Sequence, residues 1–453
     1  MRTLSRAVGW SCLLLALSSP VLAADAPPDS SALRGWLSLF KLVTNPLGAD
    51  AVSVEPGWRA SADLRVRQEL LEDVFYFTPT QPDRRWLRVR SRAGLRYGLG
   101  NAHEVQGRLC SEFRKITTPD TELNYDEIIV DQLLYRYRAW PGIAITLGRQ
   151  DIRWNDGFLV MDGTPLDGSR SSYMNALRFM IDDEGPTPGL VELFVAYNPA
   201  YDDLVLWNDD VKRRLTDADE TAVAFRSSPW ANQQLALIWK RERDPDHSRP
   251  ALDAWTLGYR GERTRGAVTV TGELALQYQD WSGDGADASG LAWATQVRLR
   301  RPLARDQRLE LGILGYSGRD GDVLPFRTPW GRWPKWGELE LYSLIGEGGV
   351  GLWANMAGAW VDVQHSRDGK LLGLTLQALT GLAPDSGLRD VLLMARVEFP
   401  LFAGIATQLR LETPLTVGYS NVDYQAPYGD VPSRPIEPGN GSFLRWQLTY
   451  ALP

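Results

Sequence analysis

The chain has 453 residues, a formal net charge of −7 and 44% hydrophobic residues. Its basic residues are scattered and not gathered in runs, which argues against nucleic acid as a partner, and no apolar run beyond the N-terminus reaches the ~18 residues of a membrane-spanning helix. With three histidines and two cysteines, the sequence presents no zinc-ligand spacing and no nucleophile–base pair, so we expect no enzyme.

The first residues have the three parts of a secretory signal. Arg2 and Arg6 supply a positive start, residues 9–17 form an apolar run, and residues 21–23 are a small-residue cleavage site. We therefore predict a signal peptide at residues 1–23.

The segment that follows the signal comes before any regular pattern. We expect residues 24–56 to form a periplasmic N-terminal arm, with a short amphipathic helix at residues 33–43 that could rest on the barrel mouth or plug it. Cys12 lies within the signal, so Cys110 is left without a partner for an internal disulfide.

From residue 57 onward, strand-like runs alternate with breaks. The runs cover residues 58–70, 85–99, 102–114, 128–140, 142–150, 173–182, 190–198, 220–228, 233–243, 252–263, 266–280, 291–301, 306–317, 350–364, 370–380, 390–400, 403–418 and 441–451. An even number of runs at this spacing is typical of an outer-membrane barrel. For residues 57–453 we predict an all-β fold, a transmembrane antiparallel β-barrel of about 18 strands.

The breaks between the runs support this prediction because short and long ones alternate. Short breaks include 100–101, 141–142, 264–265, 302–305, 365–369 and 401–402, and long ones include 71–84, 115–127, 151–172, 199–219, 281–290, 318–349 and 419–440. Outer-membrane barrels have short periplasmic turns and long extracellular loops. Residues 338–345 also look strand-like, but a further crossing would break the alternation, so we place them in a long loop.

The run at residues 85–99 shows how the two faces of each strand differ. One alternate set is apolar, with Leu87, Val89, Ala93, Leu95, Tyr97 and Leu99, and the other is cationic, with Arg88, Arg90, Arg92 and Arg96. Because a strand points alternate side chains to opposite faces, one face is oily and the other charged.

The same separation recurs along the chain. The cationic faces hold Arg65, Arg67, Arg88, Arg90, Arg92, Arg96, Arg108, Arg114, Arg136, Arg138, Arg178, Arg298, Arg300, Arg396, Arg410 and Arg445, with fewer acids among them. An arginine facing lipid costs ~2–4 kcal/mol near the midplane, whereas a water-filled lumen accepts it. A soluble β-sandwich with these arginines on its outer surface is the alternative.

An arginine-lined lumen suggests an anion conduit. Guanidinium groups keep their charge and bind carboxylates with two parallel hydrogen bonds, so rows of them offer successive weak sites to an acidic solute. Transport needs binding that is favourable enough to enter and loose enough to leave. The alternative for any one arginine is that it only neutralises a neighbouring acid in the wall.

Residues 147–181 carry a recognisable hairpin signature. Its core is Gly148-Arg149-Gln150, Asp156-Gly157, Asp167-Gly168-Ser169-Arg170 and Asn175-Ala176-Leu177-Arg178. This hairpin resembles that of the alginate export family of outer-membrane porins. The resemblance implies a monomeric barrel with an electropositive, arginine-lined constriction for a mannuronate/guluronate polymer, and by motif match it adds Arg149, Arg153 and Arg178 to the pore-lining candidates. Arg149 falls on the apolar parity of its strand, so we expect it at the membrane rim or beside a bulge.

Three functions therefore remain open for a barrel in the outer membrane of a Gram-negative cell. They are export of an alginate-like polyuronate, diffusive uptake of small carboxylates or oligosaccharides, and a non-transporting structural or adhesive role. The expected partners are outer-membrane lipid, an anionic polysaccharide or oligosaccharide and periplasmic secretion components. We expect no cofactor; the one metal alternative is Ca²⁺ on loop acids, namely Asp202, Asp203, Asp209, Asp210, Asp284 and Asp287.

Overall fold

The computed structural model describes most of the chain beyond the N-terminal segment. The described residues are 56–73, 83–100, 102–140, 142–162, 173–182, 190–207, 218–230, 232–247, 249–283, 287–330, 337–340, 354–382, 389–402, 405–418, 425–426, 429–430 and 441–452. The predicted signal peptide (1–23) and nearly all of the predicted arm (24–56) lie outside them, so both stay predictions.

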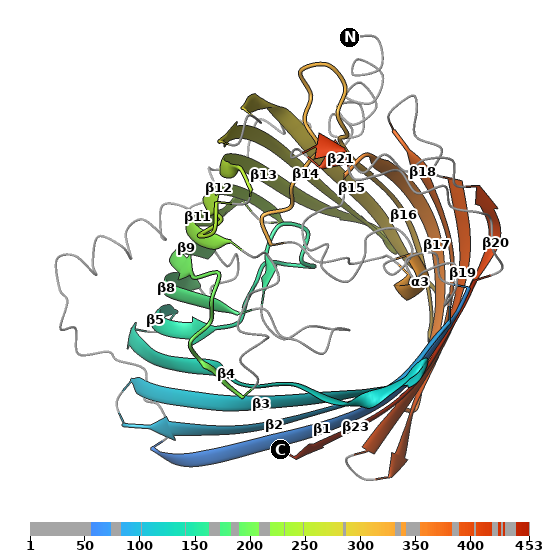
Figure 1. Cartoon of the computed structure of the whole chain (residues 1–453), viewed down its shortest axis with the longest axis horizontal. Coiled ribbons are helices and arrows are strands. Elements are labelled where there is room, and N and C mark those ends of the chain that lie inside the picture. The colour runs from blue at the N-terminus through green and yellow to red at the C-terminus, as the bar shows by residue number, and fades with distance from the viewer. Residues whose placement is uncertain are drawn as a thin grey trace.

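Eighteen long antiparallel strands form one closed barrel (Figure 1), which confirms the predicted fold class. In order round the barrel they are β1 (Gly57–Glu72), β2 (Arg84–Gly98), β3 (His103–Thr118), β4 (Asp120–Trp140), β5 (Ile143–Gln150), β8 (Met174–Asp182), β9 (Leu190–Asn198), β11 (Asp219–Trp230), β12 (Gln233–Arg243), β13 (Ala251–Arg265), β14 (Val268–Ser282), β15 (Ala288–Ala304), β16 (Gln307–Tyr316), β17 (Met356–Arg367), β18 (Lys370–Gly381), β19 (Arg389–Phe402), β20 (Ile405–Gly418) and β23 (Ser442–Leu452). The first and last strands pair with each other from Ala62↔Leu452 to Glu72↔Ser442, which closes the sheet.

Short elements accompany the barrel. A three-residue strand, β10 (Val205–Trp207), adds to the edge of β4, and β6 (Ile152–Arg153) pairs with β7 (Met161–Asp162). The pair β21 (Gln425–Ala426) and β22 (Gly429–Asp430) is separate, and α3 spans Glu338–Glu340. Among the described residues, no helix is long and apolar enough to cross a bilayer.

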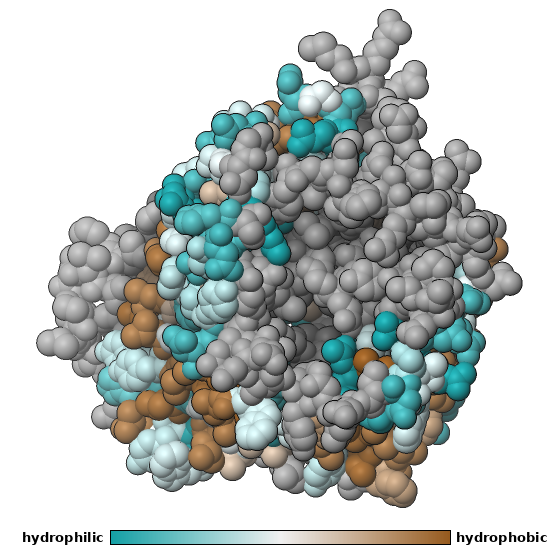
Figure 2. All heavy atoms as spheres, viewed as in Figure 1, coloured by the Kyte–Doolittle hydropathy of each residue, from teal (hydrophilic) through white to brown (hydrophobic). Residues whose placement is uncertain are grey.

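The alternation of side chains divides the wall as the sequence predicts. In β1 and β2, Val66 faces Val89 in one register position, and Arg65 faces Arg90 in the next. The large hydrophobic residues of alternate positions are exposed on the outside of almost every strand, among them Leu64, Leu109, Leu133, Leu276 and Leu409. Figure 2 shows hydrophobic residues gathered along the lower and left outer margin and hydrophilic ones beside the opening. This is the apolar band of a barrel that sits in lipid.

Tight turns join the strands at one end of the barrel. The pair Asp368-Gly369, one of the Asp-Gly signals in the sequence, joins β17 to β18 with both residues at positive φ (51° and 73°). Such a two-residue turn matches the twist of the flanking strands and fixes their register.

One predicted break differs from the structure. Residues 115–127 are not a loop, because β3 runs to Thr118, β4 starts at Asp120, and the ladder continues through Thr117↔Asp120. The segment is polar and lacks the apolar alternation by which the strands are predicted, so the sequence gives no strand signal there. Residues 338–340 form the short helix α3, in agreement with their placement in a long loop; residues 341–345 lie outside the described residues.

A charge placed on the outer face tests this arrangement. Leu276 is 50% exposed and has Leu257 and Trp293 as its cross-strand neighbours. We expect Leu276→Arg to lower the free energy of unfolding by about 2–4 kcal/mol, because an arginine near the midplane of the bilayer loses its hydration. Urea unfolding in lipid vesicles measures the change.

The matched control is Leu303→Arg. Leu303 is equally exposed but lies at the end of β15, next to the turn. The cost there should be about 0–1 kcal/mol because the side chain reaches the interface. Equal costs at both positions would contradict the placement of the lipid band.

Candidate functional site in the barrel lumen

Two loops fold into the barrel and narrow it. We call residues 151–162 the first inward loop and residues 317–330 the second inward loop. They hydrogen-bond to each other: Met161 N donates to Trp330 O (3.1 Å), and Trp330 N donates to Leu159 O (3.0 Å). In Figure 1 the teal hairpin of the first inward loop lies within the ring of strands. The narrow part of the lumen is therefore a small sheet shared by two loops that are far apart in sequence.

The first inward loop is held against the wall strands β12, β13 and β15. Asn155 Nδ2 donates to Gln234 Oε1 (2.7 Å), and Asp156 forms an ion pair with Arg298. Leu159 packs on Gly258, where a Cβ atom would lie 2.5 Å from Leu159 Cδ1. A side chain at position 258 would therefore push the loop away from the wall.

The second inward loop is held by a buried lysine. Lys240 Nζ lies 2.8 Å from Glu220 Oε1, 2.8 Å from Glu242 Oε1 and 2.8 Å from the carbonyl oxygen of Pro329. Its ammonium group also lies 4.8 Å from the centre of the Trp330 ring. Lys240 therefore links two buried carboxylates to one loop carbonyl, and Arg327 of the loop adds a second link to the wall through Glu242.

Apolar packing completes the contact between loops and wall. Trp154 and Trp330 each lie within 6 Å of the Phe194 ring, at 5.6 and 5.8 Å between centroids, and Phe158 lies 6.3 Å from Tyr316. These rings belong to one buried cluster that extends over the inner faces of β8–β18. One side of the barrel interior is thus a packed core.

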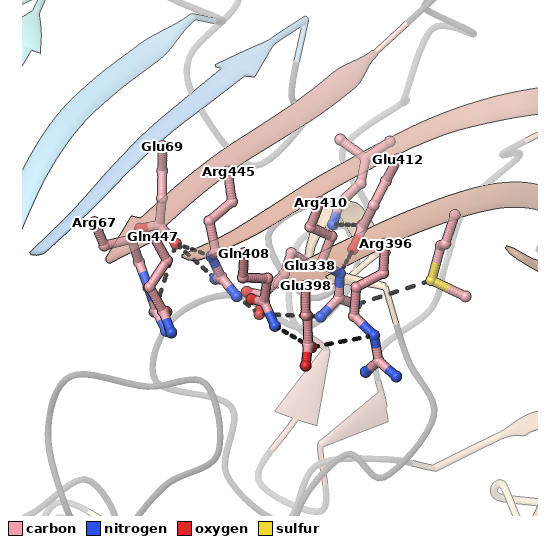
Figure 3. Close-up of polar contacts among 12 residues, drawn as sticks. Arg67, Glu69, Glu338, Arg396, Glu398, Gln408, Arg410, Glu412, Arg445 and Gln447 are labelled. Carbon is pink, nitrogen blue, oxygen red and sulfur yellow. Dashed lines mark hydrogen bonds and ion pairs between the residues drawn. The ribbon is translucent and has the colours of Figure 1, made fainter. Parts of the chain in front are cut away.

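The chain after the second inward loop docks on another part of the wall (Figure 3). In α3, Glu338 Oε1 lies 2.9 Å from Arg445 Nη2 and 3.9 Å from Arg410 Nη1, and Leu339 N donates to Glu412 Oε2 (2.8 Å). Trp333 and Trp336, which lie between the second inward loop and α3 in the sequence, are outside the described residues.

On the remaining wall, carboxylates lie beneath arginines. The side chain of Glu104 is 1% exposed and bonds to Arg96 (2.7 Å) and Arg136 (2.9 Å), whose side chains are 37% and 28% exposed. Glu69 is likewise buried between Arg67, Arg88 and Arg445. These two glutamates are therefore covered by arginines, whereas other acids of the inner face stay partly open, with the side chains of Asp63 and Glu398 18% and 38% exposed.

Most of the predicted lumen arginines share the inner face of the wall. By strand register this holds for Arg65, Arg67, Arg88, Arg90, Arg92, Arg96, Arg108, Arg136, Arg138, Arg178, Arg298, Arg300, Arg396, Arg410 and Arg445. They differ in access: Arg67, Arg298 and Arg445 are fully buried among acids, whereas the side chains of Arg96, Arg136, Arg300 and Arg396 are 28–39% exposed. Their role on a substrate path stays a prediction.

Arg149 corrects one prediction, because its side chain is buried in the wall and does not line the lumen. Its Nη2 and Nη1 atoms donate to Asp202 Oδ1 (2.7 Å) and Oδ2 (3.1 Å), and Nη1 also donates to Val130 O (2.9 Å). The guanidinium lies 3.9 Å from the centre of the Tyr173 ring. It fills the place where the β4–β5 ladder ends and β10 pairs with β4 instead.

Arg153 and Arg178, the other two arginines taken from the hairpin motif, lie in different surroundings. Arg153 lies on the first inward loop, exposed, with Nε donating to Asn155 O (2.9 Å). Arg178 lies on β8 and bonds to Glu192 Oε1 (2.8 Å). The part of the motif at residues 167–170 is outside the described residues.

Sequence reasoning missed several groups that shape the narrow part. Arg226, Lys240 and Arg260 lie on the inner faces of β11, β12 and β13, and Arg327 lies on the second inward loop and bonds to Glu242. The period-two count that identified Arg88 would also have found the three strand residues. Their loop partners carry no sequence signal.

Two of the loop acids considered for Ca²⁺ have other partners, and Ca²⁺ on these acids stays a prediction. Asp202 is occupied by Arg149 and Tyr173, and Asp287 Oδ1 accepts from Gly283 N (3.0 Å). Within the described part of the chain, no three metal-binding side chains come together. Asp209, Asp210 and Asp284 lie outside it.

Comparison with known proteins identifies the architecture. No family model matches the chain, and no curated protein matches its sequence. Among solved structures, it is similar to Pseudomonas aeruginosa OccK11 (TM-score 0.54, 13% identity, covering 87% of this chain and 96% of that one). It is similar also to Acinetobacter baumannii OccAB1 (0.55, 8%, 87% and 96%) and to P. aeruginosa OpdK with vanillate (0.54, 10%, 87% and 98%).

The shared fold is the outer-membrane β-barrel of porins. The protein is a multi-pass protein of the outer membrane. At these identities the likeness shows the fold and leaves the solute to be argued from the lumen. The alginate export family is not among these structural neighbours.

Replacing the buried lysine tests the anchoring of the second inward loop. We expect Lys240→Ala to lower the free energy of unfolding by about 3–5 kcal/mol, because Glu220 and Glu242 lose a shared counter-charge. Single-channel conductance should rise as the loop leaves the lumen. Arg241→Ala is the control, since Arg241 makes an exposed pair with Asp253 on the outer face; its cost should stay below about 1 kcal/mol.

The Arg149–Asp202 pair gives a dependence on pH. Burial would raise the pKa of Asp202, but hydrogen bonds from Arg149 and Tyr173 and the charge of Arg149 outweigh it and lower the pKa below 3.8. Because the folded pKa is depressed, the stabilisation is complete above the unfolded pKa and is lost as the pH falls through the folded one.

We therefore expect Asp202→Asn to remove roughly 1.5–3 kcal/mol of stability at pH 7 and to flatten the loss of stability below pH 4 (near the reference pKa of Asp,). Urea unfolding at several pH values measures both effects. Asp203→Asn, at the exposed neighbouring residue, should change neither. The same acid dependence in wild type and Asp202→Asn would show that the pair does not stabilise the fold.

Proposed function

We propose that this protein is a diffusion porin that takes up small carboxylates. The observation that carries the proposal is the layering of charge in the lumen: buried glutamates hold arginines whose guanidinium groups meet the water, as at Glu104 with Arg96 and Arg136. Along this part of the wall a solute meets guanidinium groups at the surface, while Glu104 lies beneath them.

This arrangement of charge favours the passage of anions over their tight binding. The guanidinium groups of Arg300 and Arg396 are already engaged by wall carboxylates, Glu310 (2.7 Å) and Glu398 (3.4 Å). A passing carboxylate therefore competes with a resident one and binds weakly. Successive weak sites let an anion enter and leave quickly.

The two inward loops are evidence that the solute is small. Residues 151–162 and 317–330 occupy part of the lumen and are fixed to it by the Arg298–Asp156 and Lys240–Pro329 contacts. A fixed constriction suits a compact molecule better than a continuous polymer. OpdK, a structural neighbour, was solved with vanillate, which is a small carboxylate.

Export of an alginate-like polymer is the second candidate, and the hairpin motif around Arg178 favours it. Both candidates need an anion-preferring lumen, so they differ in the size of solute that passes. Translocation of small carboxylates into loaded liposomes, compared with passage or block by oligomannuronate, distinguishes them. A barrel with no conductance at all would contradict both and support a structural role.

A double variant that replaces two arginines with neutral glutamines tests the anion preference. In Arg96→Gln/Arg300→Gln two of the exposed guanidinium groups are lost, yet each buried glutamate keeps a second partner: Arg136 remains on Glu104, and Trp360 Nε1 remains on Glu310 (3.1 Å). We expect the reversal potential in a salt gradient to move toward zero while the fold persists.

The control is Arg241→Gln, which removes an arginine from the outer face. It should leave the reversal potential unchanged. Cation preference in the wild-type channel would overturn the proposal.

A further inference from the structure

Basic residues gather at the turn end of β13–β18, six strands that lie side by side in the barrel (Figure 1). The hairpin ends at residues 263–268, 301–308 and 365–370 contain seven arginine and lysine residues, all exposed, and two acids. At the opposite end of β13 and β14, Asp253 lies directly across the ladder from the exposed Asp280. Because short turns mark the periplasmic end of an outer-membrane barrel, the excess of positive charge faces the periplasm.

Five of these cations lie on the outer face of the wall, and we call them the basic collar: Arg263, Arg265, Arg301, Arg367 and Lys370. Arg263 pairs in register with Val270, which is exposed on the lipid side and pairs in turn with Leu299. The other four share the parity of exposed apolar residues in their own strands, namely Leu257, Leu291, Val363 and Leu372. The collar therefore continues the lipid-facing surface beyond its apolar band.

Aromatic residues mark the depth of the collar. Trp230, which is 52% exposed, follows Gln233 and Gly261 in one register position of β11, β12 and β13, and the Tyr259 hydroxyl donates to Gln233 Oε1 (3.3 Å). Tryptophan and tyrosine of this kind lie at the level of the lipid headgroups. Arg263 is two residues beyond Gly261, which is about 5 Å along the membrane normal for a tilted strand. Its guanidinium group is therefore placed among the headgroups.

Most cations of the collar have no counter-charge within the described part of the chain. Arg263, Arg265, Arg301 and Lys370 form no ion pair and no side-chain hydrogen bond there, and Arg367 makes only an exposed pair with Asp368 (3.6 Å). The arginines of the inner wall, by contrast, are held by neighbouring glutamates. A guanidinium fork binds a phosphate with two parallel hydrogen bonds, so a phosphate from outside the chain would complete these groups.

From these features we infer that the basic collar is a binding surface for anionic phospholipid of the periplasmic leaflet. The headgroup phosphates bind at Arg263, Arg265 and Arg301, and the acyl chains lie on the apolar band above them, at Val270 and Leu299. Lipid is the occupant because the collar is continuous with the surface that lipid already covers and opposite in charge to an anionic headgroup. The inference depends on the membrane placement of the barrel and not on the solute that passes through it.

Native mass spectrometry of the detergent-released full chain tests the inference. The protein is mixed with equal amounts of phosphatidylglycerol and phosphatidylcholine, which share the phosphate and differ in net headgroup charge. We expect phosphatidylglycerol adducts to be about fivefold more abundant or more, because one basic residue near anionic lipid contributes roughly that factor. The preference should fall as the ionic strength rises.

A collar variant removes the unpaired cations. In Arg263→Gln/Arg265→Gln/Arg301→Gln/Lys370→Gln the preference for phosphatidylglycerol should fall below about twofold, because the remaining Arg367 is paired with Asp368. The milder Arg263→Gln/Arg301→Gln should give an intermediate preference. The replaced side chains are exposed, so the barrel should fold; heat-modifiable migration on gels verifies this.

The matched control removes four arginines from the opposite end of the barrel: Arg85→Gln/Arg241→Gln/Arg243→Gln/Arg249→Gln. It changes the net charge by the same amount and should keep the wild-type preference. An equal loss in the control and the collar variant would show an effect of net charge alone and overturn the inference. An unchanged preference in the folded collar variant would overturn it as well.

Urea unfolding in vesicles extends the test to a bilayer. Replacing a third of the phosphatidylcholine with phosphatidylglycerol should raise the unfolding midpoint of the wild type and the control and leave that of the collar variant unchanged. A wild type without any preference for phosphatidylglycerol would overturn the inference and leave an acidic periplasmic protein as the occupant. None of these outcomes changes the reversal potential, so the porin proposal stands or falls separately.

Discussion

Backbone hydrogen bonding in lipid is the constraint on which the rest of this structure depends. No water is available in the hydrocarbon layer, so every backbone N–H and C=O group must find a partner in the protein, and a sheet can meet this demand only when it closes on itself. The pairing of β1 with β23 completes that closure. Once the sheet is closed, each strand has one face toward lipid and one toward the interior, and the two-residue alternation of side chains becomes compulsory.

The interior then has to accommodate the charges that lipid excludes. The structure does this in two ways. On the side of β11–β15, charge is neutralised within buried clusters such as Lys240 with Glu220 and Glu242, and the inward loops cover it. Around β2–β5, glutamates are buried under arginines, as at Glu104 and Glu69. Basic and acidic side chains therefore stabilise the fold on the side of β11–β15, whereas around β2–β5 some of the arginines remain accessible to water. The degree of burial makes the difference.

The inward loops give the lumen its specific shape. They are packed by aromatic contacts to Phe194 and Tyr316 and joined to each other by backbone hydrogen bonds at Leu159, Met161 and Trp330. Because each loop is held both by the wall strands and by the other loop, its position in the lumen is fixed. The first inward loop lies directly on the inner faces of β12 and β13, where Asn155 bonds to Gln234 and Leu159 is pressed on Gly258.

The sequence by itself determined the barrel class, the approximate positions of its strands and the inner face of residues such as Arg88, Arg92 and Arg136, because lipid enforces an alternation that a local reading detects. It did not show that β3 and β4 continue through the polar residues 115–127. It failed at Arg149, whose parity was read correctly but whose partner, Asp202, lies 53 residues away. It was silent on Lys240, which meets Pro329 across 89 residues, and on which loops enter the lumen. Only the tertiary structure decided these points, because the contacts that hold a loop inside a barrel join residues whose separation in the chain follows no period.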